Sequence, residues 1–430
     1  MSLFTSDFKQ TPYWWEAAPP EPETQEPLPQ QVDVAIVGSG YTGLHAAIQT
    51  ARACRSTVVL EAQAAGFGAS TRNGGQVSTS IKASLPALTR RFGAARAAEV
   101  LGEGEASLAF MKTFIPTEKI DCDFQVVGRF HGAHLAKGYE ALARSIGVNA
   151  TVVADDAFMV PRAEQAAELG TRAYHGGIVY PHHASLHPGK YHKSLLRLAR
   201  TAGAQIVSHC AVQDLARTST GFRVQTAKGT VEAKRVILAT NGYTGSLSPW
   251  QQRRIIPIGS YIIATEELAP EVMNRLMPTN RILSDTRKLV YYYRPSPDRK
   301  RILFGGRVSL RETDALRTGP KLHAAMVNLF PELAQTKISH SWSGFVGYTF
   351  DTLMHAGNDD GLYYAMGYCG SGVGMASYLG MRIGQQAADN PDGMTAFNKI
   401  PFPTRPFYTG NPWFLAPSVL AYRFRDRFGV

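Results

Sequence analysis

The stretch that decides the fold lies near the start of the chain and reads Val32-Asp33-Val34-Ala35-Ile36-Val37-Gly38-Ser39-Gly40-Tyr41-Thr42-Gly43. Its first six residues are mostly apolar and predict a strand, and the glycines that follow predict a tight turn. Residues 44–53 have a helical composition, and residues 57–60 predict a second strand. This order is that of a βαβ unit, which indicates an α/β fold with parallel strands.

The glycine turn has the spacing of a dinucleotide site. Gly38, Gly40 and Gly43 fit GxGxxG, with Ser39 and the pair Tyr41-Thr42 between them. The first glycine permits the turn, the second lets the backbone approach a pyrophosphate, and the third lets helix pack on strand. Glu61 follows the second strand, where a carboxylate can accept the ribose hydroxyls of an adenosine. We therefore expect a bound dinucleotide.

A second glycine-rich loop follows, Gly66-Phe67-Gly68-Ala69-Ser70-Thr71-Arg72-Asn73-Gly74-Gly75-Gln76. Two such loops so close together suit a cofactor buried in an extended form.

These residues carry a family resemblance. Gly38–Gly43, Glu61 and Gly68–Gln76 resemble the D-amino-acid-oxidase-type family of FAD-dependent amine and amino-acid oxidoreductases. Three later segments agree with it: Arg235–Gly242, Trp342-Ser343-Gly344 with Thr349-Phe350-Asp351, and Gly367–Gly374. The similarity covers roughly residues 30–390. Within the family, the Tyr13-Trp14-Trp15 lead-in and the Pro-rich, aromatic tail are similar to the γ-glutamylputrescine oxidase and iminodiacetate oxidase branch.

The resemblance implies FAD as the cofactor. Some family members bind flavin covalently through a cysteine in the segment after the Trp-x-Gly motif, but Val346 stands there, so we expect non-covalent FAD. The residues expected to bind FAD are Gly38, Gly40, Tyr41, Thr42, Gly43, Glu61, Ala62, Ser70, Arg72, Asn73, Gly74, Gly75, Gln76, Val212, Thr240, Asn241, Gly242, Gly370, Ser371, Gly372, Val373 and Gly374.

The resemblance also implies a split architecture. A Rossmann-like FAD-binding layer would be built from residues 32–85, 155–245 and 350–395, and a β-rich (α+β) substrate domain from residues 86–154 and 246–349. Residues 1–31 would form a lead-in that the Tyr-Trp-Trp triplet anchors on the body, and residues 396–430 a C-terminal extension.

The activity that the resemblance implies is oxidation of an amine. The enzyme would cleave the C–N bond of a small, carboxylate-bearing secondary amine or amino acid, iminodiacetate-, sarcosine- or glycine-like. Hydride would pass to flavin, the imine would hydrolyse, and oxygen would reoxidise the flavin to give hydrogen peroxide. Three alternatives stay open: an oxidase of γ-glutamylputrescine or another polyamine derivative, a membrane-peripheral amino-acid dehydrogenase using the basic, aromatic tail Tyr422–Phe428, and a non-catalytic flavoprotein.

The substrate residues are harder to assign. Two positions that hold a carboxylate-binding cation in relatives lie around Val346 and at Gly374 here, so another cation would be needed for an anionic substrate. Arg307, which follows the strand 301–304 and the pair Gly305-Gly306, is the main candidate. Tyr291 and Tyr293, on one face of a strand, and Tyr261 are the further candidates.

Composition sets the remaining limits. The chain has 430 residues, 45 Lys and Arg against 34 Asp and Glu, and a net charge of +11 without a basic block. This favours small anionic partners over nucleic acid. Scattered cysteines (Cys54, Cys122, Cys210, Cys369) indicate neither a disulfide framework nor a zinc site, and no metal is expected at His182, His183 and His187. With no recognisable secretory signal and no apolar run of about 18 residues, we expect a cytoplasmic protein for which membrane binding is not the default.

Overall fold

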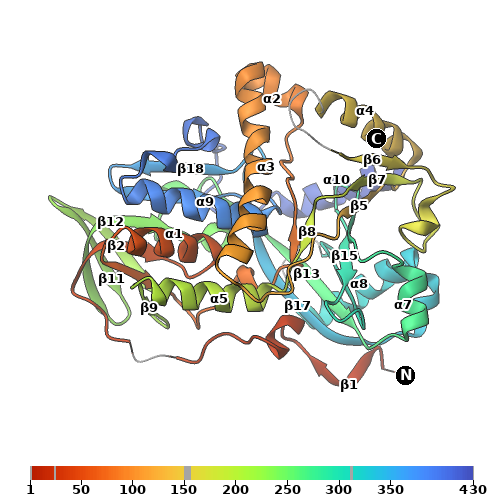
Figure 1. The fold of residues 1–430 in the computed structure, drawn as a ribbon, viewed down its shortest axis with the longest axis horizontal. Coiled ribbons are helices and arrows are strands. Elements are labelled where there is room, and N and C mark those ends of the chain that lie inside the picture. The colour runs from red at the N-terminus through yellow and green to blue at the C-terminus, as the bar shows by residue number, and fades with distance from the viewer. Residues whose placement is uncertain (1, 24–25, 150–155, 310–312, 430) are drawn as a thin grey trace.

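The computed structural model describes residues 2–23, 26–149, 156–309 and 313–429. Two large sheets lie side by side along the long axis of the molecule (Figure 1). This arrangement confirms the α/β class with a dinucleotide-type layer of discontinuous segments and a second, β-rich unit.

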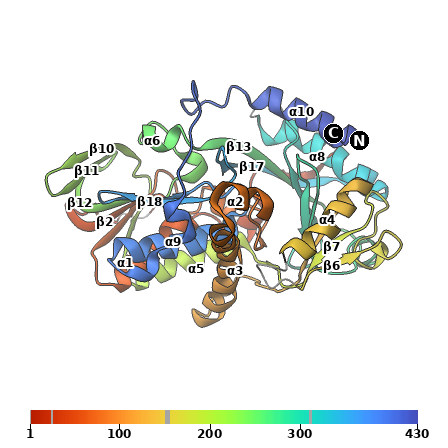
Figure 2. The same ribbon diagram turned by 90° about the horizontal axis from the view of Figure 1, so that it is seen from above.

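The first sheet contains the predicted βαβ unit. Its central strands β12, β2, β3 and β9 are parallel, with Val34–Val37 paired to Thr57–Leu60. The helices α1, α5 and α9 cover one face (Figures 1 and 2) and share a core with its apolar residues. The strands in order are β10 (Val212–Thr218), β11 (Gly221–Thr226), β12 (Gly229–Leu238), β2 (Gln31–Val37), β3 (Thr57–Leu60) and β9 (Gln205–Val207), with β19 (Leu362–Met366) paired to β12 and β18 (His355–Asp359) to β19. The covering helices are α1 (Tyr41–Arg52), α5 (Pro188–Thr201) and α9 (Gly372–Ala387).

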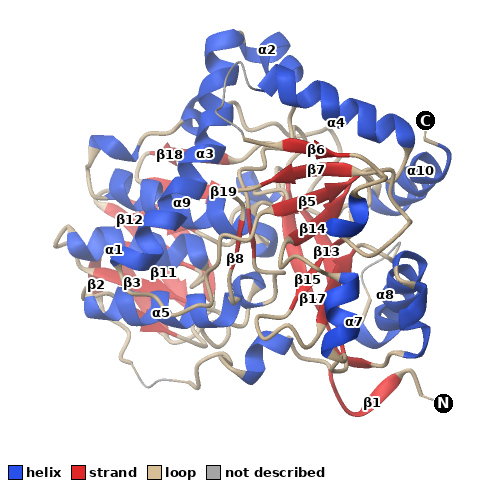
Figure 3. Ribbon diagram, turned by 45° about the vertical axis from the view of Figure 1, so that its right-hand side comes forward, coloured by secondary structure: helices blue, strands red, loops and turns tan. Residues whose placement is uncertain are grey.

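The second sheet is larger and mostly antiparallel. Its order is β1 (Phe4–Lys9), β17 (Ile338–Tyr348), β13 (Ile256–Thr265), β16 (Ile302–Gly306), β15 (Tyr292–Pro295), β14 (Ile282–Asp285), β5 (Arg129–Gly132), β7 (Gly177–Tyr180) and β6 (Phe158–Val160). Helices α7 (Pro270–Leu276) and α8 (Ala315–Leu329) contribute to a core on one face of it (Figure 3). The opposite face is turned towards the first sheet and carries the polar side chains of the site.

Strand parity decides which residues reach that polar face. Leu283, Tyr293, Phe304 and Ile263 are paired across β14, β15, β16 and β13 and lie together in the core with α8. Because side chains alternate along a strand, the neighbouring row that contains Ser284, Tyr292 and Gly305 faces the other way.

The remaining elements belong to neither large sheet. They are β4 (Gln76–Val77), which pairs with β8 (Ala184–Ser185), and the helices α2 (Leu85–Phe92), α3 (Ala94–Thr117), α4 (Ala136–Asn149), α6 (Pro249–Gln252) and α10 (Leu415–Phe428). The last helix, α10, lies on the outside of the molecule, on the side of the second sheet (Figure 2).

Two segments pack with a different sheet from the one that the expected domain limits assigned to them. Strands β6 and β7 belong to the second sheet, although the expected limit gave residues from 155 onward to the FAD layer. Helices α2 and α3 bury Leu88, Val100 and Met111 in the core of the first sheet, although residues 86–154 were expected on the substrate side. The assignment of the segments by function stays a prediction.

The N-terminal lead-in is anchored as expected. Trp14 is fully buried and its indole Nε1 donates to the carbonyl O of Asn73 at 2.8 Å. Trp15 Nε1 donates to Thr71 Oγ1 at 2.9 Å. The aromatic pair therefore holds the second glycine-rich loop in place.

Candidate active site

The turn between β2 and α1 is shaped by its glycines. Gly38 has φ +102°, a left-handed conformation that favours glycine. A Cβ on Gly43 would lie 1.9 Å from the carbonyl O of Gly38, so only glycine lets α1 begin so close to the turn. Gly40 precedes α1, whose N-terminal N–H groups are oriented for an anion.

Glu61 is held at the end of β3 by the same turn. Its Oε2 accepts from the backbone N of Ser39 at 2.9 Å and from Ser39 Oγ at 2.7 Å. The Oε1 atom accepts from the backbone N of Gln63 at 3.0 Å. The carboxylate is therefore fixed at the mouth of the glycine turn, where an adenosine ribose would meet it.

Behind the turn, His192 supports the backbone that the pyrophosphate would approach. Its Nε2 donates to the carbonyl O of Ser39 at 2.7 Å. Burial lowers the pKa of His192, so the ring is neutral at pH 7.

The second loop approaches the first through Ser70. Ser70 Oγ accepts from the backbone N of Tyr41 at 3.0 Å, at the first turn of α1. Asn73 closes the loop: its Nδ2 donates to the carbonyl O of Ser70 at 2.9 Å, and its Oδ1 accepts from Gly75 N at 2.8 Å. Both glycine-rich segments thus meet at one end of a single cavity.

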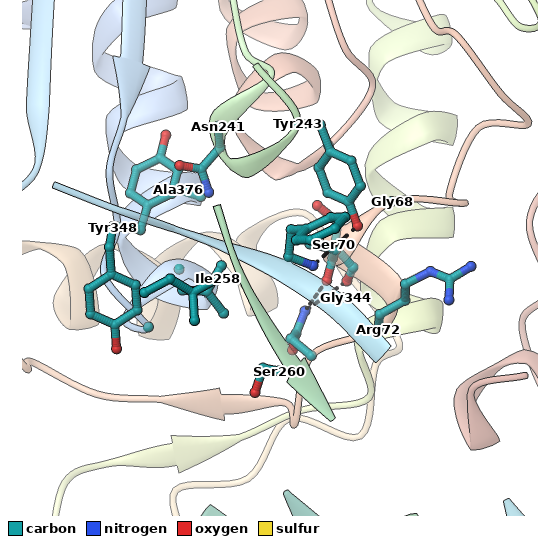
Figure 4. Close-up of a pocket in the computed structure, with 18 of the residues that line it drawn as sticks. Gly68, Ser70, Arg72, Asn241, Tyr243, Ile258, Ser260, Gly344, Tyr348 and Ala376 are labelled. Atoms are coloured by element: carbon teal, nitrogen blue, oxygen red, sulfur yellow. Dashed lines mark hydrogen bonds between the residues drawn. The ribbon is translucent and has the colours of Figure 1, made fainter. Parts of the chain in front are cut away.

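Arg72 is bound mainly by the protein itself. Its guanidinium lies over the rings of Trp15 and Phe67, at 4.7 and 4.5 Å, and its Nε donates to the carbonyl O of Phe67. In Figure 4 the side chain extends away from Tyr348 and Ser260, while the residue lies along the cavity wall. Arg72 therefore connects the second glycine-rich loop to the N-terminal lead-in.

The cavity has a volume of about 1260 Å³ and runs between the two sheets. It passes from Glu61 and Val212 along the glycine turn to Gly370–Val373, at the start of α9. Most residues expected to bind FAD line it: Gly38, Gly40, Tyr41, Thr42, Glu61, Ala62, Ser70, Arg72, Asn73, Gly74, Gln76, Val212, Thr240, Asn241, Gly370, Ser371, Gly372 and Val373.

Four of the expected residues lie just behind this wall: Gly43, Gly75, Gly242 and Gly374. A Cβ on Gly75 would lie 2.2 Å from the carbonyl O of Leu186, and one on Gly242 would lie 3.0 Å from the backbone N of Gly347. These glycines permit close packing of the chain around the cavity.

The turn before α9 is fixed by Asn241. This residue has φ +41°, and its Oδ1 accepts from the backbone N of Gly367 at 2.9 Å. Cys369 in the same turn is fully buried, and burial raises the pKa of its thiol. Among the described residues that line the cavity there is no cysteine.

The expected substrate residues are divided between two places. Arg307 is buried and lines the cavity, with Nη1 donating to the carbonyl O of Gly259 at 2.7 Å. Tyr261 and Tyr293 lie in the core with α8, and Tyr291 packs against that core. Tyr291 directly precedes β15 and packs on Phe304, as Tyr293 does, so both rings lie on the side that points away from the cavity.

Tyr292 lies on the cavity side in their place. Its hydroxyl is 2.9 Å from Ser260 Oγ, and burial raises its pKa to about 12. A Cβ on Gly305 would lie 2.4 Å from Tyr292 Cζ, and one on Gly74 would lie 3.2 Å from Cε2. Glycines on β16 and in the second loop therefore make room for this ring.

Sequence reasoning also missed cavity residues that no motif marks. Lys82, Arg129 and Ser284 line one side, and Leu415 and Val419 of α10 line another. Tyr243 directly follows the Asn241-Gly242 motif, which was a usable signal. The described residues contain no cluster of three or more His, Cys, Asp or Glu that could hold a metal ion.

The site fits an extended dinucleotide on its own geometry. The cavity joins an anion-binding helix start, a fixed carboxylate for a ribose and a backbone-lined turn at α9. The side chains that would obstruct the backbone approach are absent at Gly38, Gly40 and Gly43.

Comparison with known proteins agrees with this geometry. The chain is 31% identical over 96% of its length to the probable oxidoreductase OrdL of Rhizobium meliloti, covering 97% of that protein. It is also 31% identical to the γ-glutamylputrescine oxidoreductase of Escherichia coli, with 93% of each chain covered.

Solved structures show the same fold at lower identity. Glycine oxidase from Geobacillus kaustophilus matches with a TM-score of 0.72 and 20% identity, over 88% of this chain and 99% of that one. Iminodiacetate oxidase from Chelativorans sp. BNC1 matches with a TM-score of 0.68 and 18% identity, over 86% and 97%. A sequence model described as "DAO: FAD dependent oxidoreductase" matches residues 33–386. The chain therefore belongs to the DAO family of FAD-dependent oxidoreductases, with FAD as its cofactor.

Proposed function

We propose that the protein oxidises a C–N bond of a small amine or amino acid that carries a carboxylate. The observation that carries this proposal is Arg307, a buried guanidinium on the cavity wall. Iminodiacetate-, sarcosine- and glycine-like compounds fit such a site, and two of the fold relatives are oxidases of glycine and of iminodiacetate.

The chain's own residues have separate tasks in this proposal. Glu61, the Gly38–Thr42 turn and the Gly370–Val373 turn would hold FAD, without a covalent bond. Arg307 would bind the substrate carboxylate, since a guanidinium offers two parallel donors to it. Tyr292 stays protonated at neutral pH and offers a hydroxyl to the same space. When bound, FAD supplies the two-electron oxidation.

Oxygen is the proposed electron acceptor, with hydrogen peroxide as the product. Denatured protein should release its flavin on acid precipitation, because the site offers no cysteine for attachment among the described cavity residues. Flavin that stays with the precipitate would contradict the non-covalent assignment.

An oxidase of γ-glutamylputrescine is the second candidate. The specific observation in its favour is the relative of that name, which is 31% identical across 93% of this chain. This substrate also bears a carboxylate, so Arg307 serves both candidates, but its amine-bearing arm would need more of the cavity.

A steady-state panel with peroxide detection separates the two. The purified holoenzyme is assayed with glycine, sarcosine, iminodiacetate, putrescine and γ-glutamylputrescine. The proposal expects the highest kcat/KM with one of the small carboxylates and little turnover of putrescine. A preference for γ-glutamylputrescine would replace the first candidate by the second, and turnover of putrescine alone would overturn the carboxylate assignment.

A further inference from the structure

A second cationic group faces the same cavity from another strand. Residues alternate along β5, so Phe130 points into the core while Arg129 and His131 point to the cavity side. The Arg129 guanidinium donates from Nε to Ser284 Oγ at 2.8 Å and from Nη1 to Ser80 Oγ at 2.9 Å. Lys82, two residues after Ser80, lines the same wall.

The partners of Arg129 bring no negative charge. Within the described part of the chain it forms no ion pair with a carboxylate. His131 Nδ1 lies 3.4 Å from Nη2, and burial first, then the charge of Arg129, lowers the pKa of His131 well below its usual value, so this ring is neutral. Asp285, the next residue on β14, points to the other face, where Arg287 and the Tyr174 hydroxyl bind it.

Other buried or half-buried arginines of this chain have different hydrogen-bond partners from those of Arg129. Arg281 pairs with Glu168, and Arg287 pairs with Asp285. Arg294 has no carboxylate partner either, but it donates to three backbone carbonyl O atoms, those of Leu186, Gly75 and Pro295. Arg129 has only hydroxyls and an imidazole, although burial lowers its pKa and so disfavours its charge. A guanidinium nevertheless stays protonated in proteins, and a shielded charge without a counter-ion is costly.

The cluster lies close to the end of the cavity where oxidation would take place. The carbonyl O of Ser80 accepts from Ser371 Oγ at 2.6 Å, in the turn before α9. Ser284 pairs with Tyr292 across β14 and β15, and β16, which leads into Arg307, is the next strand. Three strand spacings separate β5 from β16, about 14 Å of sheet, and both arginines line one cavity.

We infer that Arg129, with Ser80, Ser284 and Lys82, forms a second anion subsite, and that the substrate is an amine bearing two acidic groups. This inference rests on the proposed function and narrows it: Arg307 binds one carboxylate, Arg129 binds the other, and the amine lies between them. A substrate with a single carboxylate leaves Arg129 without its counter-ion.

The test is a binding measurement on the oxidised holoenzyme, with no turnover. Flavin absorbance is titrated with succinate, adipate, suberate and sebacate, and with butyrate, hexanoate, octanoate and decanoate as monocarboxylates of matched length. At the best length, the diacid should bind at least about tenfold more tightly than its matched monoacid. If the wild-type enzyme bound every diacid about as tightly as its matched monoacid, with an affinity ratio near one, the inference would be overturned without the need for a variant.

Variants then assign the subsite. Arg129→Gln should reduce that ratio to about one to two while the monoacid Kd stays within about twofold, because Arg307 still binds the first carboxylate. Arg144→Gln, at an exposed arginine of α4, is the matched control and should keep the full ratio. An unchanged ratio in Arg129→Gln, or equal weakening of mono- and diacid, would overturn the inference.

Arg129→Lys covers the case in which Arg129→Gln fails to fold. It retains the charge but not the fork that reaches both serines, so the ratio should fall several-fold. An unchanged ratio would contradict the subsite. The proposed function would fail if the enzyme oxidised no amine. Diacid binding to the oxidised enzyme needs no turnover, so it tests the subsite independently of that result.

Discussion

Glu61 is the residue on which the adenosine end of the site depends. Its carboxylate is already oriented by Ser39 and Gln63, so FAD would meet a fixed acceptor. Glu61→Ala should raise the Kd for FAD at least about tenfold, since hydrogen bonds to a charged group contribute about 1.5–3 kcal/mol. Reconstitution of the apoprotein with FAD, followed by flavin fluorescence, measures it. Full flavin occupancy with unchanged affinity would remove Glu61 from the site.

Arg307 carries the substrate end. Arg307→Ala should lower kcat/KM about tenfold to a hundredfold, because a desolvated, charge-assisted hydrogen bond is lost. Arg307→Lys should recover only part, since an ammonium cannot reproduce the bidentate fork. Steady-state kinetics on the best substrate is the measurement, with flavin content as the control. Unchanged kcat/KM in the alanine variant would mean that another cation, such as Arg129 or Lys82, binds the carboxylate.

The residues found by sequence differ from those missed in a physical way. Gly38, Glu61 and Asn73 belong to local motifs whose spacing the backbone itself requires. Tyr293 of β15 and Tyr291, which directly precedes this strand, pack on the same side as predicted, but alternation does not say which side meets the core. Tyr292 was therefore missed by one residue. Arg129 and Ser284 come together only through the pairing of β5 with β14, which no local pattern reports.

At the scale of elements, two neighbouring glycines of the second glycine-rich loop have different surroundings. Gly75 has φ +65°, and a Cβ there would lie 2.2 Å from the carbonyl O of Leu186. Gly74 lines the cavity, and its Cβ would meet only the Tyr292 ring at 3.2 Å.

Gly75→Ala should therefore destabilise the fold, with a clear fall in melting temperature even in the apoprotein. Gly74→Val should lower flavin content and leave the melting temperature of the apoprotein within a few degrees of wild type. Thermal unfolding with and without FAD distinguishes the two effects. Wild-type flavin content in the Gly74 variant would exclude the loop from the cofactor site, and a stable Gly75→Ala would contradict the packing described.

Element order was easier to predict than element membership. The βαβ unit follows from apolar runs and glycines that are adjacent in sequence. Strands β6 and β7 are short, and only the pairing of β7 with β5 and of β6 with β7 places them in the second sheet. Helices α2 and α3 carry apolar residues that suit either core, and packing against α9 decides for the first. Sequence periodicity shows that such a helix buries one face, but it does not show which sheet that face packs against.

At the scale of the whole molecule, buried histidines predict a loss of stability in acid. Burial lowers the pKa of His187 to about 4 and that of His45 to about 3, and it lowers those of His131, His183 and His192 as well. The folded protein thus binds protons less readily than the unfolded chain, whose histidines titrate near 6.5. This stability is present above about pH 6.5 and is lost as the pH falls towards 4.

His187 offers a clean test, because its Nδ1 accepts from Lys190 N at 3.1 Å as the N-cap of α5. Asparagine caps a helix as well but does not titrate. His187→Asn should therefore lose less unfolding free energy than wild type between pH 7.5 and 5.0. Urea unfolding at both pH values measures this. An equal loss in both proteins would show that His187 does not contribute to the acid sensitivity.

The C-terminal extension completes the cavity from outside both sheets. Leu415 and Val419 of α10 line it, and Asp426 accepts from the backbone N of Leu289 at 3.0 Å, next to the cavity wall. The helix α10 thus contacts the body through Val419 and Asp426, whereas the aromatic side chains of Tyr422, Phe424 and Phe428 are exposed. Within the described residues no helix has the length and apolarity needed to cross a membrane.

The central claim is that a small, carboxylate-bearing amine reduces the FAD of this protein. The most direct measurement is anaerobic titration of the holoenzyme with iminodiacetate, sarcosine and glycine, followed by flavin absorbance near 450 nm, with acetate and putrescine as controls. The account predicts that at least one carboxylate amine bleaches the flavin fully and that neither control does. Persistence of the oxidised spectrum with every carboxylate amine, or bleaching by putrescine alone, would contradict it.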